Sequence, residues 1–143
     1  MGRKEMSVKI HSSMYNQIRD SGIATPVQVL MDLGYLSKAD LEKWRFGRVD
    51  YLERVCVASL GKLSFVLREM RAYANASGLK PSQTFYRQWG RKGKAVALRF
   101  SKTGEENIER SYATHYISPA RIAERKKVTA GPTGNDGVSD AEE

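Results

Sequence analysis

The sequence is poor in the residues on which disulfide and metal sites depend. Its 143 residues include one cysteine and two histidines. One cysteine excludes a disulfide framework, and a structural zinc site ordinarily needs four sulfur or nitrogen ligands. The segment Gly90-Arg91-Lys92-Gly93-Lys94-Ala95 also departs from a nucleotide-binding loop, because two residues separate its glycines and no hydroxyl follows the lysine. We therefore expect neither a metal nor another cofactor.

Long apolar runs are missing as well. No segment approaches the roughly 18 consecutive apolar residues of a membrane-spanning helix. The N-terminal segment does not show the charged-then-apolar pattern of an export signal. These absences predict a cytoplasmic protein without membrane contact, and a hydrophobic fraction of 41% suits one globular domain of this length.

Acidic residues are absent from one extended stretch of the chain. Residues 70–104 carry eight Lys or Arg and no Asp or Glu, and this stretch accounts for the whole net charge of +8. Such a stretch creates a local positive potential that attracts phosphate backbones and releases their counterions. The alternative interpretation is a solvated surface that simply lacks acids.

The remaining patterns predict a compact, mainly helical α+β domain over residues 1–118. Capping residues and glycine stops indicate five helices, at about 12–21, 26–33, 38–46, 51–77 and 104–117. Apolar side chains recur at three- and four-residue spacing from Leu52 to Ala74, so we expect 51–77 to form one long central helix. Gly61 would mark a kink or a close crossing in it. Residues Met6 to Ile10 fit a short strand or a frayed lead-in.

Residues 84–102 change to the period of a β-strand. Val96, Leu98 and Phe100 alternate with smaller or charged side chains. The turn Gly90-Arg91-Lys92-Gly93 lies between the two apolar runs. We therefore predict a β-hairpin with a basic tip, packed on the long helix and built from strands 84–89 and 94–101. Its apolar side chains, Phe85 among them, are expected in the core, whereas Tyr86 and Trp89 suit either the core or the surface.

Residues 119–143 are expected to lie outside the compact domain. The basic segment 121–127 is a linker or a helix extension. From Val128 onward large apolar residues are scarce and four acids appear, a composition that cannot bury enough surface to offset its ordering entropy. This predicts a disordered acidic tail.

The two short helices on either side of Gly34 resemble a helix-turn-helix, and with the hairpin they loosely resemble a winged helix. The long helix that precedes the hairpin departs from that layout. Asp40 and Glu42 on the second helix would also repel phosphates. An ordinary helical hairpin of the core is the interpretation that the residues favour, and the run Trp44–Arg48 suits either packing or base contacts.

His115 is the one candidate for acid–base chemistry. Ile108, Tyr112 and His115 share a face of the predicted final helix, and a histidine near a basic cluster suits a small nuclease. Such chemistry ordinarily needs a second acid or base, which the sequence does not supply. We expect a hydrogen-bonded structural histidine, no catalytic residue and no enzymatic activity.

Non-catalytic binding of nucleic acid, either DNA or RNA, is the function these patterns favour. The cations would neutralise phosphates and Trp89 would stack on bases. The residues expected to contact nucleic acid are Arg71, Arg87, Trp89, Arg91, Lys92, Lys94, Arg99 and Lys102. The alternative is a small regulatory module that uses the same charge to dock on an acidic protein surface.

Overall fold

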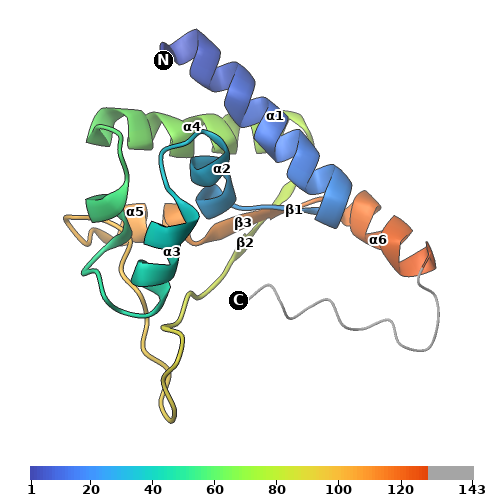
Figure 1. The fold of residues 1–143 in the computed structure, drawn as a ribbon. Helices are drawn as coiled ribbons and strands as arrows, with labels where there is room; N and C mark the ends of the chain where they lie inside the picture. Colours follow the sequence, from blue (N-terminus) through green and yellow to red (C-terminus); the bar gives the residue numbers. More distant parts are fainter. Residues whose placement is uncertain (129–143) are drawn as a thin grey trace.

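The computed structural model describes residues 1–128, which contain six α-helices, one 3-10 helix and a three-stranded sheet (Figure 1). The helices are α1 (Arg3–Ser21), α2 (Pro26–Asp32), α3 (Lys38–Arg45), η1 (Leu52–Val55), α4 (Leu60–Ala76), α5 (Glu106–Tyr112) and α6 (Pro119–Val128). The strands are β1 (Ile23–Ala24), β2 (Lys80–Gln83) and β3 (Thr114–Ile117). The predicted α+β class, mainly helical, is confirmed. The predicted acidic tail, from residue 129 onward, lies outside the described residues.

Helix α1 begins well before the predicted start at residue 12. Met6, Ile10 and Met14 are fully buried, because a spacing of four residues places them on the one face that packs against α2 and α4. The prediction of a strand or a frayed lead-in at 6–10 is therefore wrong. Val8 obscured the helical pattern, since this apolar side chain points to solvent and is 62% exposed.

The predicted long central helix is broken in its first third. Helix α4 begins only after Ser59, whose Oγ accepts a hydrogen bond from Lys62 N at 3.2 Å. The preceding residues form η1 and an extended segment through Cys56. Their backbone donors are used elsewhere, since Leu52 N donates to Arg99 O at 3.2 Å and Glu53 N to Phe100 O at 2.9 Å. Gly61 lies in the first turn of α4 and marks no kink.

The predicted final helix is also divided. Helix α5 ends at Tyr112, and the chain continues as β3, the central strand of the sheet order β1-β3-β2. Tyr116 pairs with Ala24 of β1 on one side and Pro81 of β2 on the other, both antiparallel. Proline fits here because β2 is an edge strand. His115 therefore lies on a strand, since pairing with two neighbours outweighs the helical spacing of the apolar side chains.

The two short helices α2 and α3 match their predictions closely. Thr25 Oγ1 accepts a hydrogen bond from Gln28 N at 3.2 Å, and Ser37 Oγ accepts one from Asp40 N at 3.1 Å. Each hydroxyl satisfies a backbone donor that the first turn of a helix leaves unpaired. Local capping chemistry thus defines both helices.

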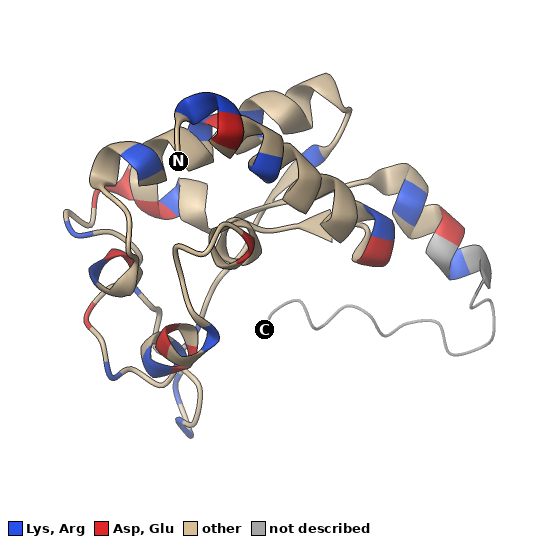
Figure 2. Ribbon diagram, turned by 45° about the horizontal axis from the view of Figure 1, so that its top comes forward, with Lys and Arg blue, Asp and Glu red and all other residues tan. Residues whose placement is uncertain are grey.

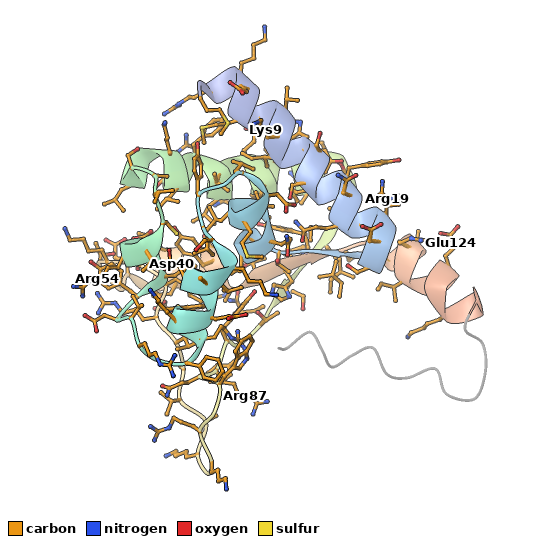
Figure 3. The ribbon with its side chains drawn as sticks, viewed as in Figure 1. Lys9, Arg19, Asp40, Arg54, Arg87 and Glu124 are labelled. Atoms are coloured by element: carbon orange, nitrogen blue, oxygen red, sulfur yellow. The ribbon has the colours of Figure 1, made fainter. Side chains whose placement is uncertain are left out.

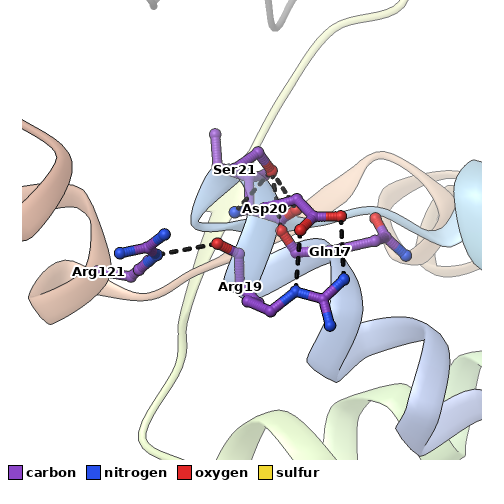
Figure 4. A network of polar contacts seen from close by, with 6 residues as sticks. Gln17, Arg19, Asp20, Ser21 and Arg121 are labelled. Carbon is purple, nitrogen blue, oxygen red and sulfur yellow. Dashed lines mark hydrogen bonds and ion pairs between the residues drawn. The ribbon is translucent and has the colours of Figure 1, made fainter.

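Helix α6 docks against the C-terminal end of α1 (Figure 4). Arg121 Nε donates to Arg19 O at 3.0 Å, and Ser118 N donates to Gly22 O at 2.9 Å. Gly22 has a φ of +83°, and a Cβ there would lie 2.8 Å from Ile122 Cδ1. The segment predicted as a linker or a helix extension is a separate helix held by these contacts. Within residues 1–128, no helix combines the length and apolar content that crossing a membrane requires.

Replacing Ser59 with alanine tests where α4 begins. Because Ser59 Oγ caps the helix, Ser59→Ala should lower the free energy of unfolding by about 1 kcal/mol. In an unbroken helix over 51–77, position 59 would be interior, and alanine, the better helix former, would raise stability instead. Urea unfolding followed by circular dichroism measures the difference.

Gly61→Ala is the matched control in the same turn. The nearest atom to a Cβ at Gly61 is Ser59 Oγ at 3.9 Å, so alanine fits without strain. It should raise the free energy of unfolding by roughly 0.5–1 kcal/mol through the entropy of the unfolded chain. A stabilising Ser59→Ala would contradict the observed start of α4.

Candidate nucleic-acid interface

The basic loop, residues 84–102, projects from the domain at the end opposite to the N-terminus (Figure 1). Its two legs run antiparallel but form one β-bridge, between Arg87 and Ala97. The predicted reversal of the chain is present, whereas the predicted strands 84–89 and 94–101 are irregular. Two backbone donors of the first leg bond outside the loop, Thr84 N to Ala113 O at 2.9 Å and Trp89 N to Arg45 O at 2.7 Å, whereas Gln88 N bonds to Val96 O of the second leg at 2.9 Å.

An aromatic cluster anchors the base of the basic loop; its members are Trp44, Tyr86, Phe100, Tyr112 and His115. Phe100 lies at its centre, 5.0 Å from Trp44, 5.2 Å from Tyr86 and 5.3 Å from Tyr112 between ring centroids. Trp44 Nε1 donates to Arg99 O at 2.7 Å, so the indole holds the second leg by packing and by a hydrogen bond. The loop is predicted to pack on a long helix over residues 51–77. In the structure this contact is made by η1, which forms the first part of that segment.

Two carboxylates fix the end of the second leg. Glu109 on α5 accepts hydrogen bonds from Phe100 N at 2.9 Å, Ser101 N at 2.7 Å and Ser101 Oγ at 2.6 Å. Glu53 on η1 accepts from Lys102 N at 2.9 Å and from the Tyr112 hydroxyl at 2.8 Å. Hydrogen bonds to charged acceptors are stronger than neutral ones. These acids therefore bind the backbone at the base of the loop.

The tip of the loop carries cations that no nearby acid neutralises. Arg87, Arg91, Lys92 and Lys94 are exposed, and no carboxylate within residues 1–128 forms an ion pair with any of them. Figure 2 shows blue at the tip and no red along the loop. Arg87 lies on the first leg of the loop, on the opposite side of the molecule from Lys9 (Figure 3). The loop therefore presents positive charge to solvent.

The structure separates the other predicted contact residues from this tip. Arg99 folds back, with its Nε donating to Ser101 O at 2.8 Å, its Nη2 to Lys102 O, and its guanidinium 5.1 Å from the Tyr51 ring. Lys102 is exposed at the base, where its backbone is held by Glu53. Arg71 lies on α4 beside Tyr116 of β3, on the far side of the domain from the tip. The structure thus brings together Arg87, Trp89, Arg91, Lys92 and Lys94.

Aromatic side chains divide between the two sides of the loop. Tyr86 points into the aromatic cluster, while Trp89 is 37% exposed. Phe85, predicted to be a core residue, is 54% exposed. Its neighbour Tyr86 already occupies the inward position, so Phe85 faces solvent on the opposite side of the leg.

The end of α3 adds residues that the sequence did not assign to the site. Trp44 and Arg45 are buried, and the Arg45 guanidinium lies 4.5 Å from the Trp89 ring centroid and 5.1 Å from that of Tyr86. Phe46 is 42% exposed and meets the edge of Trp89. The run Trp44–Arg48 thus supplies packing and one exposed ring, and only a structure shows that it lies beside the loop.

His115 is enclosed by the aromatic cluster. It is 5% exposed, and its Nε2 lies 2.9 Å from the Tyr86 hydroxyl oxygen. Burial lowers the pKa of His115 to about 4 and raises that of Tyr86, so a neutral phenol and a neutral imidazole share this hydrogen bond. Among residues 1–128, no three His, Cys, Asp or Glu side chains gather to hold a metal ion. His115 is therefore a buried, hydrogen-bonded histidine of the aromatic cluster.

Comparison with known proteins adds no functional information. No protein-family model, no curated protein and no solved structure matches this chain. The charge, exposure and geometry of the basic loop and its neighbours therefore carry the functional inference.

Burial of neutral His115 makes stability depend on pH. An unfolded histidine takes up a proton near pH 6.5, whereas folded His115 does so only near pH 4. Between these values the unfolded state holds more protons, so the free energy of unfolding should fall by up to about 3 kcal/mol as the pH drops from 6.5 to 4. Urea unfolding across this range measures the slope.

His115→Gln isolates this contribution from the titration of carboxylates. Glutamine keeps a hydrogen-bonding group opposite Tyr86 but does not titrate. The variant should be less stable at pH 7 and show a shallower loss of stability on acidification. Parallel slopes for the two proteins would show that His115 is not held neutral by the fold.

Proposed function

We propose that this protein binds nucleic acid without catalysis, through the tip of the basic loop. The observation that carries the proposal is the set of exposed cations Arg87, Arg91, Lys92 and Lys94, which no carboxylate of residues 1–128 pairs. Some cations elsewhere on the domain do stand beside acids, as Lys43 beside Asp40 and Arg54 beside Asp50 do. A cation without a neighbouring acid attracts phosphate without first breaking an ion pair.

The architecture of the base supports this proposal. Glu53 and Glu109 direct their oxygens at backbone amides and hydroxyls at the base of the loop. They therefore add structural anchoring where the loop leaves the domain. An anchored base with a projecting basic tip suits contact with a polymer that passes across the end of the domain. We place this binding in the cytoplasm, which suits a chain whose single cysteine, Cys56, is free.

Removing the charge of the tip should abolish most binding. Fluorescence anisotropy with labelled single-stranded DNA, duplex DNA and RNA, each at two salt concentrations, measures affinity and its salt dependence. Replacing Arg91, Lys92 and Lys94 with alanine should weaken binding to the preferred polymer about tenfold or more. It should also reduce the slope of log affinity against log salt by up to about 3, because each phosphate contact contributes about one counterion.

A second triple variant controls for net charge. Lys4, Lys9 and Lys62 are exposed lysines of α1 and α4, away from the loop, and replacing them with alanine removes the same charge. This variant should keep its affinity within about twofold. Equal weakening in both variants would refute the assignment to the loop. Absence of binding by the folded wild type at low salt would refute the proposal and favour an acidic protein partner.

A further inference from the structure

Three aromatic side chains are exposed on or beside the basic loop: Phe46 at 42%, Phe85 at 54% and Trp89 at 37%. Large rings of this kind are ordinarily buried in part or whole, so a group of them at one end of a domain calls for a reason. Tyr15 on α1 is the other exposed aromatic side chain among the described residues. The exposed rings therefore coincide with the exposed cations.

Trp89 and Phe46 are held in a fixed relation to each other. Their ring centroids lie 5.5 Å apart with the planes at 76°. Trp89 N donates to Arg45 O at 2.7 Å, and the Arg45 guanidinium covers one face of the indole at 4.5 Å. Gly90 has a φ of +78°, and a Cβ there would meet the Phe46 ring at 3.4 Å. The pair is thus set before any ligand arrives, which lowers the entropic cost of using it.

Cations surround this pair of rings. The Arg48 guanidinium carbon lies 5.6 Å from the centroid of Phe46, and Arg91 and Lys92 follow Trp89 after one glycine. Proteins that bind single-stranded nucleic acid combine positive charge along the backbone with aromatic rings on which bases stack. In a duplex the faces of the bases are covered by their neighbours, so exposed rings gain no contact from it.

We propose that the site binds single-stranded nucleic acid, with unpaired bases stacking on Trp89 and Phe46 while Arg91, Lys92 and Lys94 contact the phosphates. This inference rests on the proposed function and adds the class of polymer. Arg45 is a positioning residue, since it supports the indole from behind. The exposed remainder of the Trp89 ring is the surface on which a base stacks.

Three labelled probes of equal length separate single-strand binding from binding of nucleic acid in general. They are an oligothymidylate, an abasic oligonucleotide with the same phosphates, and a DNA duplex. Anisotropy titrations of the full chain should show the oligothymidylate binding at least about fivefold tighter than the abasic strand, because stacking of one base is worth that factor or more. The duplex, whose base faces are covered, should bind less tightly than the oligothymidylate.

Tryptophan emission reports the stacking directly. The chain has two tryptophans, and Trp44 is fully buried, so quenching on addition of the unlabelled oligothymidylate reports Trp89. Quenching should be strong with that strand and weak with the abasic one. Trp89→Ala should remove the preference for bases, whereas Trp89→Phe should retain part of it. Tyr15→Ala, which removes the exposed ring of α1, should leave both affinities unchanged.

The outcomes distinguish the two proposals. Equal affinity for the oligothymidylate and the abasic strand, or a preference for duplex, would overturn the single-strand inference and leave loop-mediated binding in place. No binding of any probe at low salt would overturn both. The comparison of probes uses the wild-type protein, so it holds even if Trp89→Ala fails to fold.

Discussion

The packing of Phe100 between Trp44 and Tyr112 is the contact on which the arrangement of the site depends. These three side chains come from the basic loop, α3 and α5, and all are at most 3% exposed. Their burial joins the loop and α5 to α3, which lies far from both in the sequence. The Trp44 indole also donates to Arg99 O, so burial and hydrogen bonding hold the same point of the chain. A loop held there by two helices leaves the body of the domain in one direction only.

The uneven distribution of charge along the loop follows from this anchoring. Backbone amides of residues 100–102 have no sheet partner and are satisfied by Glu53 and Glu109. These two acids are thus committed to the base of the loop. The cations at its tip remain exposed, and Trp89 and Phe46 stay partly exposed beside them because Arg45 and Tyr86 fill the space underneath. One set of buried contacts therefore sets both the charge and the aromatic surface of the site.

Local signals in the sequence were sufficient for α2 and α3, where Thr25 and Ser37 cap the first turns. The sequence was misleading where tertiary contacts overrule local spacing. Leu52 keeps its helical spacing with α4, yet its amide bonds to Arg99 and the helix does not form there. Residues 114–117 continue the apolar spacing of α5, yet pairing with β1 and β2 makes them a strand. The cations of the loop are visible in sequence, whereas Phe46 is not, because only the fold brings α3 beside Trp89.

The most direct test of this account is an NMR titration of the full chain with a short single-stranded oligonucleotide. The account predicts that the largest changes in amide chemical shift fall in residues 87–94 and at Phe46, where the cations and rings are exposed. The amides of Phe100 and Ser101, bound to Glu109, should change little. Changes centred on α1, α4 or α6, with the basic loop unaffected, would contradict it.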